Sequence, residues 1–520
     1  MKQELSAKQV KTIISSSKEF CFVDVREIGQ HAKGHPFFSI SIPFSVFENK
    51  IEELTPNKNT LIIIFDQNDG LSEFVYTEAK NLGYNNLYIL RDGVFGWEKE
   101  GYELFDGINI PSKAFGEWIE EEYRTPHIKP FELAKKIQNK ENILVLDGRT
   151  IEEYQKMNIP SSVNCPNMEM PVRIKKQINK NTEIIVGCAG RTRSIIGTQN
   201  LINYGIENSV KALENGTQGW SLANFKLEHN QNRRVPLSKL NPEKSFIEKA
   251  EFIIKKYGIK KINFDDTIKL LREKSITTYI FDVTETKQNI SFLPNKIRNV
   301  PGGQLIQATD NYIGVWNSKI ILLDDGELVR ASMTATWLKQ MGHSVYVYND
   351  KPEILFKKMK FFKEKFSIDN DKKVKLSKLK NFKHFNMIDI RNSHSYRRSH
   401  IVKSRWFSRA NLRLMKITKG KDILIIYDDI TKAQLVTKTI NEKNQVNIFY
   451  YYFDKKDITE KPYLFTKSPY FPKTKDCIDF IYHTHKRHNG NRTHAKAYLS
   501  WEKTLLNRMD EQELKKFIKL

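Results

Sequence analysis

One short segment of the sequence carries residue types that could do covalent chemistry. It reads Cys-Ala-Gly-Arg-Thr-Arg-Ser over residues 188–194 and follows an apolar run, residues 183–187, that is typical of a buried strand. The segment after it is predicted to be a helix, so the cysteine would face free backbone N–H groups and the positive end of a helix dipole. Because Arg191 and Arg193 add positive charge, we expect Cys188 to ionise below the pKa of about 8.5 that a free thiol has.

These properties predict a two-step sulfur transfer. The Cys188 thiolate would attack a sulfane sulfur, and the resulting persulfide would then be discharged to a second thiol or to cyanide. The guanidinium groups would bind an anionic donor such as thiosulfate or a persulfide, and the loop amides would hold the terminal sulfur. The candidate substrate-binding residues are those that follow the cysteine: Ala189, Gly190, Arg191, Thr192, Arg193 and Ser194. This chemistry needs no metal, nucleotide or flavin, so no cofactor is expected.

Two other functions fit a reactive cysteine in such a loop. Cysteine-dependent phosphatases use a C-x5-R loop, whereas Arg193 stands five residues after Cys188 and gives C-x4-R. The shorter loop suits sulfur better than a phosphoryl group, which disfavours a phosphatase or an arsenate reductase. A non-enzymatic persulfide carrier or sensor for another protein stays open.

The elements that would position the loop recur four times along the chain. Apolar runs end at Asp24, Asp147, Asp282 and Asp389, and about 40 residues later second runs end at Asp66, Cys188, Asp325 and Asp429. The runs read as buried parallel strands. A helical segment closed by glycine follows the second run, as in residues 194–204 before Gly205, and a third strand follows in three copies. This pattern predicts tandem α/β domains, each with a small parallel sheet.

The repeat divides the chain into domains, separated by linker candidates at residues 120–130, 229–244 and 357–380. The predicted domains cover residues 1–122, 123–235, 245–355 and 372–470, and a helical C-terminal extension covers residues 471–520. In the domains that lack Cys188, its position is taken by Asp66, by Asp325 or Asp324, and by Asp428 or Asp429. An aspartate cannot carry a persulfide, but it can cap the helix and supply the anion that the loop attracts. These three domains are therefore predicted to be catalytically silent.

Residues 188–194 resemble the active-site loop of the rhodanese sulfurtransferases, of the form C-x-G-R-T-R-S. Asp147 with Arg149 resembles the family's D-x-R motif, and residues 163–166 and 216–220 resemble its V-N-x-P and G-x-x-G-W segments. The resemblance implies a five-stranded parallel sheet with helices on both faces. The order of the four units, with the tail that follows them, resembles bacterial proteins with four tandem rhodanese-like domains.

Three further residues near the predicted site have alternative interpretations. Cys165 is either a resolving thiol that exchanges sulfur with Cys188 or a small buried residue. Arg173 either lines the pocket or lies at the surface. The arginine at the position of Arg149 recurs in units without the cysteine, so we expect Arg149 to form an internal ion pair with a carboxylate such as Glu152 or Glu153 rather than to bind the substrate.

Composition narrows the choice of partners and location. Lys plus Arg exceeds Asp plus Glu by 85 to 61, but the resulting charge of +24 is spread over the whole chain, which disfavours a nucleic-acid surface. The four cysteines have no disulfide pattern, and no apolar run is long enough to cross a membrane. We therefore expect a cytoplasmic protein whose partners are a small sulfur-containing donor and a thiol acceptor, either a small molecule or a protein. The tail histidines lack the second half of a zinc site, so no metal is expected: His483, His485, His488 and His494.

Overall fold

The computed structural model describes most of the chain and divides it into two compact units. The described residues are 2–236, 244–285, 297–358, 368–369, 372–375, 384–412, 421–441, 446–481 and 491–520. One unit comprises Met1–Lys11, Phe22–Ile108 and Lys363–Tyr482, and the other comprises Thr12–Cys21, Asn109–Phe362 and His483–Leu520.

Four parallel sheets form from successive parts of the chain, one for each sequence repeat. The first has the order β1 (Glu4–Leu5), β5 (Leu87–Leu90), β4 (Leu61–Phe65), β2 (Phe20–Asp24), β3 (Ser39–Ser41). The second has the order β6 (His127–Ile128), β10 (Val210–Leu213), β9 (Glu183–Gly187), β7 (Ile143–Asp147), β8 (Val163–Asn164). The third has the order β11 (Lys260–Ile262), β15 (Ser344–Tyr348), β14 (Lys319–Leu323), β12 (Thr278–Asp282), β13 (Ile297–Asn299). The fourth has the order β18 (Arg405–Trp406), β16 (Phe385–Asp389), β19 (Asp422–Tyr427), β20 (Ile448–Tyr452).

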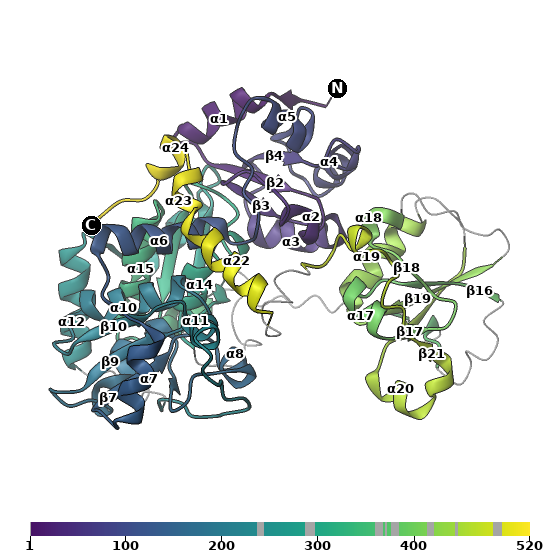
Figure 1. Ribbon diagram of the computed structural model, residues 1–520. Helices are drawn as coiled ribbons and strands as arrows, with labels where there is room; N and C mark the ends of the chain where they lie inside the picture. Colours follow the sequence, from purple (N-terminus) through teal and green to yellow (C-terminus); the bar gives the residue numbers. More distant parts are fainter. Residues whose placement is uncertain are drawn as a thin grey trace. The chain divides into compact units, whose positions relative to one another are not determined.

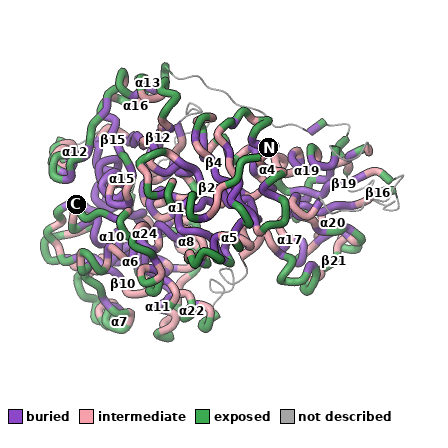
Figure 2. The backbone as a smooth tube through the Cα atoms, turned by 90° about the horizontal axis from the view of Figure 1, so that it is seen from above, coloured by how far each residue is buried: buried purple, intermediate pink, exposed green. Residues whose placement is uncertain are grey.

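The central strands are the apolar runs of the sequence, and they are buried because helices flank the sheets (Figures 1 and 2). Strand β2 is buried at every residue, and β4, β9 and β14 are buried at every residue but the first. Strands covered on both faces have no polar side to alternate with, which explains the continuous apolar runs. The predicted fold class, tandem α/β domains with small parallel sheets, is confirmed.

Helices connect the strands of each sheet. In the first repeat they are α1 (Ala7–Ser15), α2 (Ile28–His31), α3 (Phe47–Leu54), α4 (Leu71–Asn81) and α5 (Gly93–Lys99). In the second they are α6 (Ile110–Tyr123), α7 (Pro130–Gln138), α8 (Ile151–Lys156), α9 (Met170–Arg173), α10 (Thr192–Tyr204) and α11 (Gly216–Leu222). In the third they are α12 (Lys244–Lys256), α13 (Phe264–Arg272), α14 (Gly302–Gln307), α15 (Val329–Gln340) and α16 (Pro352–Lys358). In the fourth they are α17 (Ser393–Arg398), α18 (Arg409–Leu412), α19 (Ile430–Asn441) and α20 (Lys455–Glu460), beside a small antiparallel pair, β17 (His400–Ile401) and β21 (Phe465–Thr466).

Several local predictions can be compared with these elements. Helix α10 ends at Tyr204 and its cap Gly205 has a φ of 87°, as predicted. A strand after the second helix also occurs in the fourth repeat, as β20, where the sequence pattern gave only three copies. The stretch 120–130 is only partly a linker, because α6 continues to Tyr123.

The C-terminal segment forms three short helices within the same compact unit as the second and third repeats. They are α22 (Arg492–Lys503), α23 (Leu505–Arg508) and α24 (Glu511–Leu514). Helix α22 contacts α6 and α11 (Figure 1). In the described part of the chain, no helix is long and apolar enough to span a membrane.

Candidate active site

The loop that begins at Cys188 follows β9, the middle strand of the second sheet, and leads directly into α10, which begins at Thr192. The Cys188 carbonyl oxygen accepts a hydrogen bond from the Thr217 N–H at 2.8 Å. A Cβ at Gly216, whose φ is 51°, would overlap the Cys188 carbonyl. The glycine is therefore required by the close approach of α11 to the loop.

Hydrogen-bond donors surround the Cys188 sulfur. The backbone N–H groups of Gly190 and Ser194 face it, and the Arg193 guanidinium acts on it through its charge. The Ser194 hydroxyl donates to the carbonyl oxygen of Arg191 at 2.8 Å. Of the loop amides expected to hold the sulfur, those of Gly190 and Ser194 face it.

The Cys188 side chain is nevertheless withdrawn from solvent, since the residue is only 2% exposed. Burial raises the pKa of the thiol, and this effect outweighs the Arg193 charge and the hydrogen bonds from Ser194 and Gly190, which lower the pKa. The expectation of a pKa below that of a free thiol is therefore wrong. The sequence showed the nearby charges but not the desolvation.

Arg191 turns toward α6 and is held by two carboxylates. Its Nε and Nη2 each lie 2.7 Å from an oxygen of Glu117, and Nη2 also pairs with Glu120. The pKa of Glu117 is raised to about 7. Burial is the main cause, and the nearby Glu502 and Glu120 also raise this pKa, whereas Arg191 lowers it. Arg191 therefore fixes the loop to α6, and its charge is already compensated.

Arg193 is paired as well, but it stays beside the sulfur. Both of its terminal nitrogens bind Glu153 of α8, at 2.6 and 2.7 Å. Burial would raise the pKa of Glu153, but the Arg193 charge and hydrogen bonds bring it down to about 2. Arg193 is thus the loop arginine whose charge acts on Cys188.

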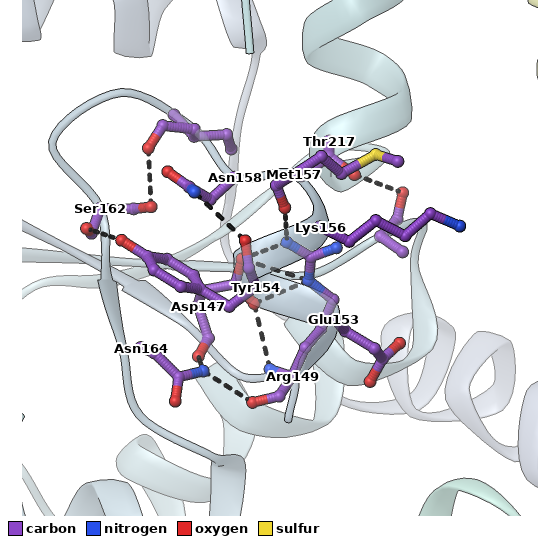
Figure 3. Close-up of polar contacts among 12 residues, drawn as sticks. Asp147, Arg149, Glu153, Tyr154, Lys156, Met157, Asn158, Ser162, Asn164 and Thr217 are labelled. Atoms are coloured by element: carbon purple, nitrogen blue, oxygen red, sulfur yellow. Dashed lines mark hydrogen bonds and ion pairs between the residues drawn. The ribbon is translucent and has the colours of Figure 1, made fainter. Parts of the chain in front are cut away.

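The D-x-R motif forms an internal ion pair next to this region (Figure 3). Arg149 binds the two oxygens of Asp147 at 2.9 and 2.7 Å, and its N–H also donates to Asp147 at 3.1 Å. The predicted internal ion pair exists, but the partner is Asp147 and not Glu152 or Glu153. The same geometry recurs in Arg26 with Asp24 and in Arg391 with Asp389, which marks it as structural.

Helix α22 brings residues to the loop that the sequence reading missed. The Thr192 hydroxyl donates to Glu502 Oε1 at 3.1 Å, and the Tyr498 hydroxyl donates to the same oxygen at 3.0 Å. A Cβ at Gly190 would lie 3.5 Å from both Glu502 Oε2 and the Tyr498 ring. The resemblance of the tail to that of four-domain relatives was the one signal that could have pointed to these residues.

The accessory candidates have structural partners. Cys165 is fully buried in the apolar core with Leu146 and Met170, and burial raises the pKa of its thiol. This fits the interpretation as a small buried residue. Arg173 does not lie at the surface: it is buried and binds Glu169 at 2.7 Å and Glu285 at 2.8 Å.

In other repeats a carboxylate occupies the place of Cys188. Asp66 accepts hydrogen bonds from the N–H groups of Asn68 and Ser72 at 2.8 and 2.9 Å. Asp324 accepts three such bonds, of which that from Gly326 measures 3.0 Å. Asp325, the other candidate, instead pairs with Arg330.

In the fourth repeat the helix-capping carboxylate is that of Asp429. It accepts hydrogen bonds from the N–H groups of Thr431 and Lys432 at 2.8 and 3.2 Å. These contacts agree with the predicted capping role.

The histidine-rich tail is only partly described. His483, His485 and His488 lie outside the described residues, whereas His494 belongs to α22. Within the described ranges, no group of His, Cys, Asp and Glu side chains is arranged to hold a metal ion.

Comparisons with known proteins point to one family. The model of the rhodanese-like domain matches residues 6–100 and 130–223. The crystal structure of a thiosulfate sulfurtransferase from Pseudomonas aeruginosa is similar to this chain with a TM-score of 0.88 and 28% sequence identity, over 99% of both chains.

Sequence relatives match over shorter segments. The Bacillus subtilis protein named "Putative sulfur carrier protein YrkF" is 29% identical over 96 residues, which are 18% of this chain and about half (51%) of that protein. The Escherichia coli (strain K12) protein YibN is 26% identical over 97 residues, which are 18% of this chain and 68% of that protein. The chain thus contains two segments that match the rhodanese-like domain, and along its whole length it is similar in structure to a thiosulfate sulfurtransferase.

Proposed function

We propose that the protein transfers sulfane sulfur from an anionic donor, thiosulfate or a persulfide, to a thiol or to cyanide through a persulfide on Cys188. The observation that carries this proposal is the position of Cys188, whose sulfur faces the loop amides where Asp66 in the first repeat presents a carboxylate. A nest of amides that binds a carboxylate also suits the negative charge of a persulfide. The name of the similar Pseudomonas aeruginosa enzyme supports the same reaction.

The first step loads the cysteine. The Cys188 thiol loses its proton, and its sulfur attacks the sulfane sulfur of the donor. A bond forms between Sγ and the sulfane sulfur while the donor's own bond to that sulfur breaks, and the leaving group, sulfite when the donor is thiosulfate, takes the electron pair. Because burial raises the pKa of the thiol, we expect this step to accelerate as the pH rises from neutrality.

The second step transfers the added sulfur from Cys188 to the acceptor. The acceptor attacks the terminal sulfur, the bond from that sulfur to Cys188 breaks, and Sγ leaves with the electron pair. Sulfur passes from donor to acceptor without a net oxidant or reductant, so the residues of the loop suffice for the transfer.

The six residues after Cys188 divide into two groups in this proposal. Gly190 and Ser194 offer N–H donors to the terminal sulfur, and Arg193 offers positive charge to the donor. Ala189, Arg191 and Thr192 shape the loop, because Arg191 is already bound by Glu117 and Glu120. The contacts of Cys165 and Arg173 give no support for a part in the transfer.

Thiocyanate formation from thiosulfate and cyanide tests the proposal. Wild type is expected to turn over and Cys188→Ser to be inactive. Intact mass after exposure to the donor alone is expected to rise by about 32 Da, the mass of one sulfur atom, in wild type only. Equal turnover by the two proteins would contradict the proposal.

A persulfide carrier is the second candidate, because the sulfur that must react is only 2% exposed. The name of the Bacillus subtilis relative is in keeping with it. Formation of the adduct with negligible turnover would favour the carrier. We propose the reducing cytoplasm as the location, because the spacing of the four cysteines in the sequence shows no disulfide pattern.

A further inference from the structure

The carboxyl group of Glu502 is buried beside the Cys188 loop and is only half satisfied. The residue is 1% exposed, and its Oε1 accepts the hydrogen bonds from Thr192 and Tyr498. Its Oε2 has no hydrogen-bond partner in the described part of the chain. Buried polar atoms nearly always have a partner in native proteins, so Oε2 marks a place where a ligand can supply one.

Gly190 connects this oxygen to the reaction centre. Its N–H faces the Cys188 sulfur, and a Cβ added to it would lie 3.5 Å from Glu502 Oε2. The Tyr498 ring and the Gln218 amide nitrogen lie at the same distance from that Cβ position. The unpartnered oxygen of Glu502 therefore lies beside Gly190, the residue whose N–H faces the Cys188 sulfur.

The charges around the loop show what kind of ligand fits. Arg191 is matched by Glu117 and Glu120, and Arg193 is matched by Glu153. Among the residues that the structure describes, Glu502 forms no such ion pair. An additional negative charge at Oε2 would be unfavourable in this buried place, whereas a positive N–H donor would be stabilised by a charge-assisted hydrogen bond.

We infer that the sulfur acceptor is a small thiol that carries an ammonium group, that is, an aminothiol. The inference rests on the proposed function and names the acceptor class for the same site. The ammonium would donate to Glu502 Oε2 while the acceptor's sulfur approaches Cys188. A neutral hydroxyl in that position would form a weaker hydrogen bond, and a carboxylate would be repelled.

The transfer to such an acceptor balances without another reagent. The aminothiol reacts as its thiolate and attacks the terminal sulfur of the Cys188 persulfide. A bond forms between these two sulfurs, the bond between the terminal sulfur and Sγ breaks, and Sγ keeps the electron pair. Sγ then takes up the proton that the acceptor's thiol lost, so the products are an aminothiol persulfide and the Cys188 thiol.

The burial of the site favours a small acceptor. Cys188 and Glu502 are both almost fully enclosed, whereas Ala189 between β9 and Gly190 is partly exposed. A molecule must displace side chains or part of α22 to reach both groups, and a short thiol requires the smallest displacement.

The discharge of the loaded protein tests the inference. Wild type, Glu502→Gln and Glu511→Gln are loaded with inorganic polysulfide, and the loss of the added sulfur mass is followed with cysteamine, 2-mercaptoethanol or 3-mercaptopropionate. Cysteamine and 2-mercaptoethanol differ chiefly in an ammonium against a hydroxyl, so their rates, corrected for the thiolate fraction of each, report the charge preference.

We expect wild type to prefer cysteamine over 2-mercaptoethanol by about tenfold, with 3-mercaptopropionate slower than both, since a charge-assisted hydrogen bond differs from a neutral one by about that factor. Glu502→Gln is expected to bring the ratio close to one. Its amide oxygen can still accept from Thr192 and Tyr498, so the variant changes only the charge and the unpartnered oxygen. Glu511→Gln, at an exposed carboxyl of α24, is expected to keep the wild-type ratio.

The outcomes separate this inference from the proposed function. An adduct that forms on wild type but discharges with no preference for cysteamine, or with the same preference in Glu502→Gln, would overturn the aminothiol and leave the sulfur transfer standing. A wild type that gains no sulfur mass at Cys188 would overturn both. Equal melting temperatures of the three proteins show that Glu502→Gln retains its fold.

Discussion

The loops after β4 and β9 have the same geometry around different side chains. Asp66 and Cys188 each follow the middle strand of a sheet, and each carbonyl accepts an N–H from the helix behind it, Val94 at 2.9 Å and Thr217 at 2.8 Å. In both loops the side chain faces the N–H groups of the second and sixth residues that follow: Asn68 and Ser72 for Asp66, and Gly190 and Ser194 for Cys188.

The difference shows what a cysteine at this place changes. The amides form an anion-binding nest in both repeats, and in the first repeat the chain fills it with its own carboxylate. In the second repeat the nest surrounds a thiol whose pKa burial raises, and in the function we propose a persulfide or a substrate supplies the negative charge. The first loop thus supplies its own anion, whereas the second loop, with Cys188 and two arginines in place of other residues, does not.

The strongest test of this comparison is Cys188→Asp, which gives the second repeat the same side chain that the first repeat has at Asp66. We expect sulfur transfer to be abolished, at least about 10³-fold, because a carboxylate can form no persulfide. We also expect a melting temperature no lower than that of Cys188→Ser, since the carboxylate can accept from Gly190 and Ser194. Thiocyanate formation and calorimetry measure the two effects, and a much lower melting temperature for Cys188→Asp would show that the two nests are not equivalent.

The reverse exchange, Asp66→Cys, measures how much the Asp66 carboxylate contributes to stability through the N–H groups that it binds. The N–H of the buried residue Ser72 and that of the exposed residue Asn68 would lose a charged acceptor. Because water can replace the acceptor at Asn68, the bond to Ser72 dominates, and we expect the unfolding free energy measured in urea to fall by about 1.5–3 kcal/mol. Asp69→Cys, at an exposed position of the same loop, is the matched control, and an equal loss in both variants would contradict the comparison.

The sequence predicted the repeat and the loop because both depend on local pattern. Buried parallel strands are continuous apolar runs, and the seven residues from Cys188 to Ser194 carry the nest within themselves. The partners of the loop could not be read in the same way. Glu117 lies in α6, a helix that runs into the stretch 120–130 that the sequence suggested as a linker, and Glu502 lies 310 residues from Thr192, whose hydroxyl donates to it.

The predicted direction of the Cys188 pKa shift was wrong for a related reason. Charges are visible in the sequence, so Arg191 and Arg193 were both counted toward the thiolate. Solvent exclusion depends on what covers the loop, and the ion pairs depend on which helix lies opposite, and neither is encoded near the cysteine. Local motifs therefore located the site, and tertiary packing decided its electrostatics.

In the third repeat, the carboxyl group of Asp324 stands at the place of Cys188, and its contribution to stability is expected to depend on pH. The pKa of Asp324 is raised from its usual 3.8 to about 6, because burial and the neighbouring Asp325 together outweigh the lowering effect of Arg330 and of backbone hydrogen bonds. A folded pKa above the unfolded one means that the folded state binds the proton more tightly, so this contribution to stability is present below about pH 4 and lost as the pH rises through 6.

We expect the unfolding free energy of wild type, relative to Asp324→Asn, to fall by on the order of 3 kcal/mol between pH 4 and pH 7. Urea titrations across that range measure it, with Asp265→Asn, an exposed aspartate of α13, as the control. A difference between wild type and Asp324→Asn that does not vary with pH would contradict the expected titration.

The smallest expected effect separates the two arginines that distinguish the second loop from the others. Arg193 lowers the pKa of Cys188 against the larger raising effect of burial, whereas Arg191 is bound to Glu117 and Glu120 and is not among the principal groups that set that pKa. Arg193→Gln should therefore move the pH dependence of Cys188 alkylation by iodoacetamide to higher pH, which slows the reaction severalfold at neutral pH. Arg191→Gln should leave that profile nearly unchanged and lower the melting temperature, because it leaves buried carboxylates unpaired. Equal shifts of the alkylation profile in the two variants would mean that the loop acts on the sulfur through its total charge. That result would contradict the separate roles assigned to Arg191 and Arg193.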